Sequence, residues 1–363
     1  MKSFFKIFTS LFVGAVCTWL VVRNMDWSAV GAHLATLSAA PVVLYVATLI
    51  PTHFFRAARW EYLLRPIGVS LPLARLLPIS SVGFLAIMAL PFRLGEFVRP
   101  YYLVRAGHCR MSAALGTVAV ERVVDGLFIS LVLFATYLAS PAEFSRPVAV
   151  LGGASLKYFA WLSLAIFLSA TLFLSLAHKW PRFTVTWSLR LSLLPRVAPN
   201  LAHKVADKLH ALIHGFRALH HPAHLVPFLL QSAAYWGFNG LGMWLLARGM
   251  GLPVTLVAAY AMMSFTGVVI SLPNAPGLVG QFQVGIVAVL AAYVEQSQVV
   301  AAGGAYAIVV HAIQVLWYLG VGVISLRFVG TSASLRQMVA DSKAAADAAE
   351  ASPVAAGEVN APL

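Results

Sequence analysis

Long apolar runs recur along nearly the whole chain, and they constrain its fold more than any other feature. A helix needs about 20 apolar residues to cross roughly 30 Å of hydrocarbon. Only 10% of the residues are charged and 60% are hydrophobic, whereas soluble domains carry about 25% charged residues. The sequence therefore excludes a soluble single-core enzyme and predicts an all-α polytopic membrane protein. The apolar segments are 7–22, 41–55, 76–91, 113–140, 158–177, 225–247, 254–272, 281–298 and 301–326.

Two of these segments are interrupted by proline and glycine. The run 76–91 leads into Pro91 and a charged stretch, and the run 254–272 leads into Pro273 before the chain returns as 281–298. Non-helical backbone at membrane depth is tolerated only where it is buried in protein or lines a wet cavity. We predict six full spans plus two re-entrant hairpins, or about eight transmembrane helices. The first run is taken as a span because no signal-peptide cleavage pattern follows it.

The distribution of basic residues predicts the orientation. The N-terminus, 56–75, 93–110, 178–224 and the chain after 326 hold 20 of the 25 lysines and arginines. Cytoplasmic loops carry this excess, so both termini are expected in the cytoplasm. The net charge of +13 then indicates contact with anionic lipid, and no nucleic-acid partner is expected.

An internal repeat is visible in the order of small and polar residues, between 41–140 (repeat A) and 225–327 (repeat B). The glycine-to-proline spacing is 23 residues in one copy and 22 in the other. The charge pattern places Arg65 in the cytoplasm and Arg248 outside, so the copies have inverted topology, as in many secondary transporters. Repeat A contains Arg65-x-x-Gly68, Leu90-Pro91, Gly95-Glu96-Phe97 and Arg122-x-x-Asp125; repeat B contains Arg248-x-x-Gly251, Leu272-Pro273, Gly280-Gln281-Phe282 and His311-x-x-Gln314.

The expected domain organisation is a transmembrane domain over 1–328 and a tail. Within the domain, 178–224 is basic and amphipathic, which is typical of a helix on the lipid surface. His210 and His214 have the i, i+4 spacing of metal ligands, but no third ligand is evident and no metal site is expected. The Ala-rich tail 329–363 lacks apolar periodicity and is predicted to be disordered.

The densest polar stretch is LPFRLGEFVRPYYLVR, at 90–105. It contains Arg93, Glu96 and Arg99, and guanidinium groups bind phosphate oxygens in a bidentate way. A phospholipid or polyprenyl-phosphate headgroup is therefore the expected partner. The alternative is that these arginines only anchor a hairpin to lipid phosphates.

The second polar stretch, AVERVVDGLF, lies inside an apolar run. Each ionised group at such a depth costs about 2.5–3.5 kcal/mol even on the lenient insertion scale, so these side chains need partners. Arg122 and Asp125 are three residues apart and can pair on one helical face, while Glu121 needs another partner, such as an arginine of the first hairpin. The alternative is a purely structural network of ion pairs.

Two further groups of polar residues are weaker candidates. Arg56 and Arg59 lie beside Trp60 at the end of the second span. We interpret them first as an interfacial anchor, and second as an entry site for a lipid headgroup. In repeat B we expect an uncharged polar cavity. We expect His311 to be a hydrogen-bonded histidine of the protein core rather than a proton carrier. The repeat B candidates are Asn274, Gln281, His311 and Gln314.

Several motifs of energy coupling and catalysis are missing from the sequence. It contains no GxxxxGK[ST] loop, HExxH, DxD or GxSxG. We expect no cofactor and no catalytic residue, and transport that is passive or driven by a gradient.

At these motifs the sequence resembles the transmembrane, flippase-like region of lysylphosphatidylglycerol synthases and their stand-alone relatives. The resemblance rests on Arg56-x-x-Arg59-Trp60, LPFRLGEFVRPYYL, ERVVD and LPNAPGLVGQF, and it covers about 5–328. It implies a multi-pass protein of the bacterial inner membrane that moves lipid between leaflets, with Glu96, Arg122 and Asp125 in the family's charged motifs.

Two departures from the family limit that resemblance. Gln281 and Gln283 stand where a glutamate is expected, which puts an acid role in doubt there. About 35 residues follow the last span, so no soluble aminoacyl-transferring domain is expected and lysyl transfer is not carried over.

The main hypothesis is a lipid transporter, and a homo-oligomer is one expectation for its assembly. The alternatives are a membrane-embedded transferase acting on a lipid-linked substrate, with Glu96 or Asp125 as base, and a non-catalytic scaffold of envelope assembly.

Overall fold

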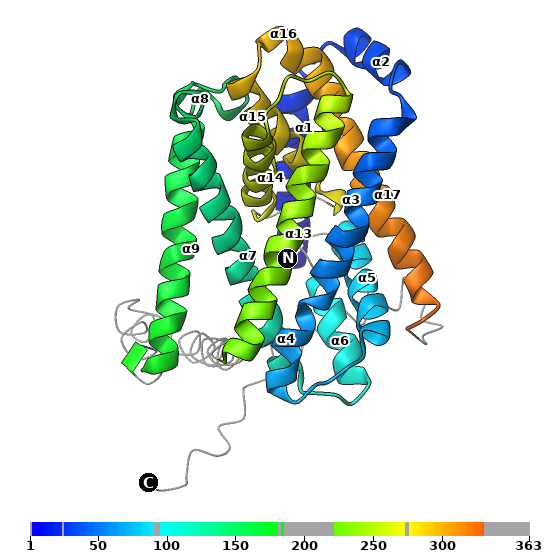
Figure 1. The fold of residues 1–363 in the computed structure, drawn as a ribbon, viewed down its shortest axis with the longest axis vertical. Helices are drawn as coiled ribbons and strands as arrows, with labels where there is room; N and C mark the ends of the chain where they lie inside the picture. The colour runs from blue at the N-terminus through cyan, green and yellow to red at the C-terminus, as the bar shows by residue number, and fades with distance from the viewer. Residues whose placement is uncertain are drawn as a thin grey trace, which may run out of the picture.

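The described part of the chain is helical. The computed structural model describes residues 2–23, 25–90, 95–180, 183–184, 221–272 and 276–329, with backbone alone for 2–11 and 178. In these ranges the only β-type pairing is a single bridge between Pro147 and Ser155. The main helices (Figure 1) are α1 (Lys2–Val22), α2 (Trp27–Ala35), α3 (Ala39–Ala58), α4 (Trp60–Leu64), α5 (Leu73–Ala89), α6 (Val98–Arg105), α7 (Met111–Ala139), α8 (Pro141–Ser145), α9 (Leu156–Lys179), α13 (Pro222–Gly249), α14 (Leu256–Ile270), α15 (Gln281–Tyr293), α16 (Gln296–Gln298) and α17 (Gly304–Leu326).

The helices have the lengths and composition of a multi-pass membrane protein. Within the described residues, four helical stretches are long and apolar enough to cross a membrane: Ala39–Ile67, Leu156–Ala177, Pro276–Tyr293 and Gln296–Leu326. Helices α7 and α13 have 29 and 28 residues and are about 40 Å long. The predicted all-α polytopic class is confirmed.

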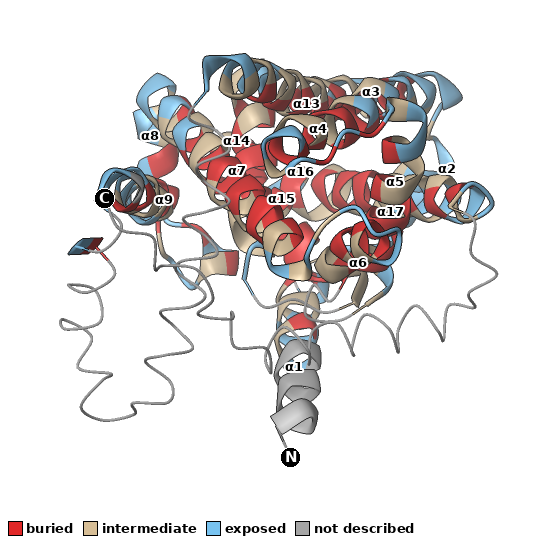
Figure 2. Cartoon of the chain, turned by 90° about the horizontal axis from the view of Figure 1, so that it is seen from below, coloured by how far each residue is buried: buried red, intermediate tan, exposed pale blue. Residues whose placement is uncertain are grey.

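The outward faces of the helices are apolar, as expected for a surface in contact with lipid. Buried residues gather at the centre of the bundle, where α3, α5, α7, α13, α14, α15 and α17 meet, and exposed residues face outward (Figure 2). Leu138, Leu162, Leu230 and Leu316 are 59–69% exposed. Large apolar surfaces of this kind are unfavourable in water and favourable in hydrocarbon.

Each interrupted segment forms two helices, one on either side of the interruption. Helices α14 and α15 have 15 and 13 residues, about 22 and 20 Å, and they pack on each other. Both lie in the upper half of the bundle in Figure 1, while α5 and α6 lie in the lower half. Each helix alone is shorter than the roughly 30 Å of the hydrocarbon core, but the stretch Pro276–Tyr293 that contains α15 is long enough to cross, so the re-entrant hairpins stay a prediction.

Helices from the two predicted repeats pack on each other. Helices α3 and α13 run side by side in opposite directions (Figure 1) and lie along one side of the bundle (Figure 2). Around them α17 packs on α5, and α7 packs on α14, so that each repeat's last helix lies on the other repeat's hairpin. Gly68 and Gly251 end the first helical segment of each copy, with φ of +81° and +79°, a conformation that glycine adopts without steric penalty.

Several predictions fall on residues outside the described ranges. These are Arg93, Asn274, most of the amphipathic segment 178–224 and the tail 329–363. The proposed domain boundaries stay predictions.

Candidate functional site

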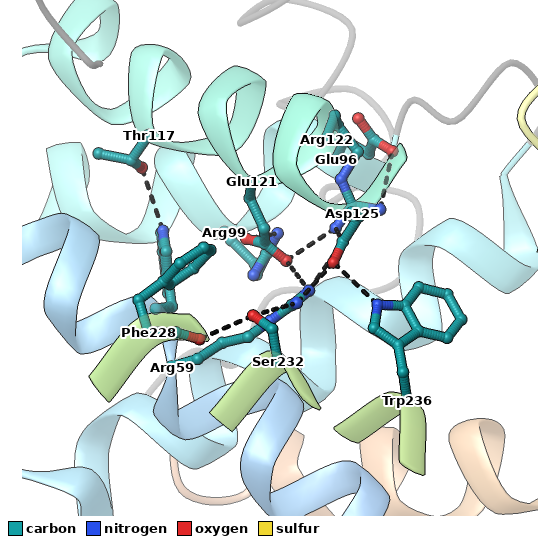
Figure 3. A network of polar contacts seen from close by, with 11 residues as sticks. Arg59, Glu96, Arg99, Thr117, Glu121, Arg122, Asp125, Phe228, Ser232 and Trp236 are labelled. Atoms are coloured by element: carbon teal, nitrogen blue, oxygen red, sulfur yellow. Dashed lines mark hydrogen bonds and ion pairs between the residues drawn. The ribbon is translucent and has the colours of Figure 1, made fainter. Parts of the chain in front are cut away.

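A group of ion pairs is enclosed between α3, α4, α6, α7 and α13 (Figure 3). Its acidic members, Glu121 and Asp125, lie one turn apart on the inner face of α7 and are 0% and 7% exposed. Arg59, which follows α3 and is 0% exposed, donates to both Asp125 oxygens at 2.5 and 2.8 Å. It also donates to Glu121 Oε1 at 3.0 Å. This bidentate geometry is the strong form of an arginine–carboxylate pair.

Two more arginines complete the coordination of Glu121. Arg99 Nη2, from α6, lies 2.9 Å from Glu121 Oε2, and Arg122 Nη2 lies 2.7 Å from Oε1. Arg122 also pairs with Asp125 Oδ2 at 3.0 Å, and its Nη1 lies 4.0 Å from Glu96. We call the seven side chains Arg56, Arg59, Glu96, Arg99, Glu121, Arg122 and Asp125 the charged cluster.

Helix α13 supplies neutral partners from the other repeat. Ser232 Oγ accepts a hydrogen bond from Arg59 at 3.1 Å and donates to Phe228 O at 2.8 Å. Trp236 Nε1 donates to Asp125 Oδ1 at 3.3 Å. The cluster therefore joins repeat A to the first helix of repeat B.

The path of Arg99 to the cluster depends on a small residue in α5. A Cβ placed on Gly83 would overlap Cγ of Arg99, so the arginine side chain lies directly across this glycine. Its guanidinium carbon is 4.8 Å from the ring centre of Trp60 and 5.4 Å from that of Phe84. Close approach of the α5 backbone thus allows the side chain to reach Glu121.

Arg56 lies one turn before Arg59 and has a different environment. Its guanidinium carbon is 4.0 Å from the ring centre of Phe84, 5.6 Å from Tyr235 and 5.4 Å from Tyr318. Cation–π contacts of this kind stabilise a desolvated arginine. Among the described residues, no carboxylate forms an ion pair with it.

One turn before Arg56 on α3, His53 lies beside two of these rings, Phe84 and Tyr318. It is 6% exposed, and its Nε2 is 2.8 Å from Ser81 Oγ. The Ser81 hydroxyl hydrogen goes to Leu77 O at 2.7 Å, so Nε2 carries the hydrogen and donates to Ser81. The other ring nitrogen, Nδ1, has no hydrogen-bond partner among the described residues.

A second, uncharged polar group lies in repeat B. His311 contacts Gln283 Nε2 at 2.8 Å through Nδ1 and Gly277 O at 2.7 Å through Nε2. Nε2 donates to the carbonyl, so Nδ1 accepts from Gln283. One turn later, Gln314 donates to the Tyr45 hydroxyl at 2.7 Å. A cavity of about 150 Å³ lies between α1, α15 and α17, with Gln283 in a lining that is otherwise mostly apolar.

The model of one protein family covers almost the whole chain. The family is described as the lysylphosphatidylglycerol synthase TM region, and its model matches residues 7–339. The chain belongs to this family. No curated protein and no solved structure matches it significantly.

The family assignment confirms the resemblance seen in the sequence and supports a multi-pass membrane protein. Both charged motifs of this family member meet in one cluster, since Glu96 and Arg99 come from the first hairpin and Glu121, Arg122 and Asp125 from α7. The pairing of Arg122 with Asp125 agrees with the helical spacing. An arginine of the first hairpin does pair with Glu121, as the sequence suggested.

One expectation for this family member needs correction. Arg59 and Trp60 were expected first as an interfacial anchor, but both side chains are completely buried. Trp60 Nε1 donates to Thr117 at 3.1 Å inside the protein. Arg59 lies within the protein because two carboxylates of α7 compensate its charge.

Among the repeat B candidates, His311, Gln314 and Gln281 lie within the described residues. His311 and Gln314 occupy separate hydrogen-bond groups, while Gln281 is buried on α15 at 1% exposure. Gln283, a polar residue of the same segment that was not among the predicted site residues, is the partner of His311. In the described ranges no group of three or more histidine, cysteine or acidic side chains could hold a metal ion.

Several residues of the site were missed at the sequence level. The roles of His53, Ser232, Trp236 and the three rings around Arg56 depend on contacts between distant segments. The sequence does contain a pattern that indicates part of this arrangement. Thr48, Thr52, Arg56 and Arg59 recur at three- and four-residue steps, and His53 is adjacent to Thr52, which marks one polar face of an otherwise apolar helix.

Proposed function

We propose that this protein is a lipid transporter of the bacterial inner membrane, which moves a lipid with a phosphate-containing headgroup between leaflets. The observation that carries the proposal is the charged cluster inside an apolar bundle, in which three arginines pair with three carboxylates and a fourth, Arg56, lies against aromatic rings one turn before Arg59. A purely structural network needs no excess of arginine. An excess held at membrane depth is what a phosphate headgroup requires from its binding site.

The arrangement of the hairpins supports movement rather than anchoring. Each hairpin packs against the last helix of the opposite repeat, so that a shift of one repeat changes the surroundings of both hairpins. Alternating access in transporters with inverted repeats works by such rocking around a site at the repeat interface. The acyl chains stay in the bilayer while the polar headgroup passes along the protein.

The proposal assigns no covalent step to the cluster. Arginines neutralise phosphate, and Glu121 and Asp125 hold the arginines in position. The energy source is a gradient of the lipid itself or of an ion, since no nucleotide-binding loop is present in the sequence.

The test is a leaflet-specific assay in proteoliposomes with a panel of labelled native lipids. Wild type is compared with Arg122→Gln, which removes a cluster charge, and with Arg65→Gln, because the Arg65 side chain is 45% exposed and pairs with Glu61 outside the cluster. We expect selective lipid movement by wild type and Arg65→Gln and its loss in Arg122→Gln. Properly inserted wild-type protein that accelerates none of the lipids would refute the proposal.

A further inference from the structure

The turn Pro276–Gly280, which leads into α15, is held by a chain of three hydrogen bonds. Gly280 N donates to Gln283 Oε1 at 2.9 Å. Gln283 Nε2 donates to His311 Nδ1 at 2.8 Å, and His311 Nε2 donates to Gly277 O at 2.7 Å. The chain therefore runs from one end of the turn to the other through a single histidine of α17. We call Gly277, Gly280, Gln283 and His311 the turn network.

The turn network fits only one protonation state of His311. The carbonyl of Gly277 can only accept, so Nε2 carries a hydrogen, and the Gln283 amide nitrogen can only donate, so Nδ1 carries none. A second ring hydrogen, on Nδ1, would point at this amide nitrogen, donor against donor. Turning the amide over would offer its oxygen to Nδ1 but would place its nitrogen against the N–H of Gly280. A proton on His311 therefore breaks one of the three hydrogen bonds in either arrangement.

The backbone of the turn depends on these hydrogen bonds. Gly277, Leu278 and Gly280 have φ of +70°, +60° and +82°. Leu278 is the one non-glycine residue with positive φ in the described ranges, and this conformation is sterically costly for a residue with a side chain. Such a conformation persists only where its surroundings hold it. Losing one hydrogen bond of the turn network therefore favours a different conformation of the turn.

A cavity beside the turn leaves room for that change. The cavity of about 150 Å³ between α1, α15 and α17 is bordered by Val279, Gly280 and Gln283. Side chains that border a cavity lack the close packing that resists movement elsewhere in a protein interior. His311 itself is fixed more firmly, because its ring stacks on Phe282 with the ring centres 4.8 Å apart. The turn can therefore move while the histidine stays in place.

No charged side chain contacts His311 among the described residues. The turn, α15 and α17 contain no Asp, Glu, Lys or Arg. His53 and Arg56 of α3 face Tyr318, two turns further along α17. A proton on His311 is thus compensated by no carboxylate, and it acts on the hydrogen bonds of the turn network alone. The other titratable side chains described on the helices around the network are Cys17 of α1, Tyr45 of α3, Arg75 of α5, Tyr293 of α15 and Tyr306 of α17.

In the predicted repeat, His311 corresponds to Arg122. Arg122 Nη1 lies 4.0 Å from Glu96, in the interrupted segment of its own repeat. His311 likewise contacts the interrupted segment of repeat B, at Gly277 and Gln283. An arginine is always charged, whereas a histidine can change its charge between about pH 5 and pH 8. Of these two corresponding contacts, only the one in repeat B can respond to a proton.

We propose that His311 is a proton-binding site that controls the turn Pro276–Gly280. Neutral His311 holds the turn, and protonation of Nδ1 breaks the hydrogen bond from Gln283 or the one from Gly280 and releases it. The inference rests on the proposed function and adds a proton as a second ligand of the transporter. His311 remains the hydrogen-bonded core histidine that the sequence predicts, and its hydrogen bonds are what make it sensitive to a proton. Release of the turn changes the first turn of α15, which packs on α1, α14 and α17.

The test measures hydrogen–deuterium exchange of the amides 277–283 by mass spectrometry, in protein reconstituted in nanodiscs of phosphatidylcholine. Opening of a local segment accelerates this exchange. Wild type is compared with His311→Gln at each pH, so that the intrinsic pH dependence of exchange cancels in the ratio of the two rates. Glutamine keeps an N–H for the Gly277 carbonyl but does not titrate. Between about pH 8 and about pH 4.5, which spans the titration of histidine, the ratio of wild type to His311→Gln should rise at least about tenfold, the effect of one lost hydrogen bond.

Two further variants complete the design. His53→Gln is the matched control, because it removes another buried histidine, on α3, that lies outside the turn network. Its exchange ratio to His311→Gln should rise as that of wild type does. The carboxylate introduced by Gln283→Glu can accept from Gly280 N–H and from protonated Nδ1 at the same time. At about pH 4.5 this variant should therefore exchange at least about tenfold more slowly than wild type.

Three results would overturn the inference. They are a ratio of wild type to His311→Gln that is constant across the pH range, loss of the rise in His53→Gln, and exchange of Gln283→Glu as fast as wild type at low pH. The proteoliposome assay separates this inference from the proposed function. A proton-dependent turn in a protein that moves no lipid would refute transport and leave the proton site standing. Lipid movement together with a constant exchange ratio would refute the proton site and leave transport standing.

Discussion

Replacing Arg59 by methionine tests how the charged cluster is held together. The substitution keeps an unbranched side chain but removes four hydrogen bonds, at 2.5 and 2.8 Å to Asp125, 3.0 Å to Glu121 and 3.1 Å to Ser232. Asp125 then keeps Arg122 and Trp236, but it loses its bidentate partner. Removing one member of a buried ion pair costs about 3–5 kcal/mol, because a charge is left without compensation.

The measurement is the unfolding temperature of the detergent-solubilised protein, followed by tryptophan emission. A change of 1 kcal/mol corresponds to roughly 2 °C for a chain of this size, so Arg59→Met should lower the unfolding temperature by about 6–10 °C. Arg65→Met breaks an exposed pair with Glu61 and should cost less than about 1 kcal/mol. Equal unfolding temperatures of the two variants would refute the structural role of Arg59.

The double variant Arg59→Met/Asp125→Leu distinguishes lost pairing from lost packing. Replacing both members of a buried ion pair by apolar residues of similar volume is often neutral. Glu121 retains Arg99 and Arg122 in this variant, so most of the lost stability should return. Additive losses from the two substitutions would show that the contacts do not couple.

Three other predictions concern packing, thiol reactivity and topology. Gly83→Val places a side chain against Arg99 and should destabilise the protein by about 1–3 kcal/mol, measured by the same thermal unfolding. Burial raises the pKa of the Cys109 thiol, in the turn between α6 and α7, so less thiolate is present at a given pH. Its maleimide labelling, followed in a chain whose other cysteine is replaced, should have a midpoint above the value of about 8.5 for a free thiol; a midpoint at or below that value would contradict the burial. Cysteines placed singly at the repeat-related positions Arg65 and Arg248, both exposed, should react with an impermeant maleimide from opposite sides of the membrane, and labelling from one side only would contradict the inverted repeat.

Much of the architecture follows from local sequence properties. Apolar runs and the distribution of basic residues depend on the chemistry of single segments and of the bilayer, so they predict spans and orientation without tertiary contacts. The proline and glycine interruptions predict two hairpins for the same reason. The pairing of Arg122 with Asp125 was also predictable, because residues three apart share a helical face whatever surrounds the helix.

The composition of the site, in contrast, depends on which helices meet. Arg59 and Asp125 are 66 positions apart, and Arg59 and Ser232 are 173 apart. An arginine at the end of an apolar run has the same local pattern whether it anchors to lipid phosphate or pairs with a buried carboxylate. Only the packing of α3 on α13 and of α4 on α7 decides between these alternatives, because desolvation and charge compensation are properties of the assembled bundle.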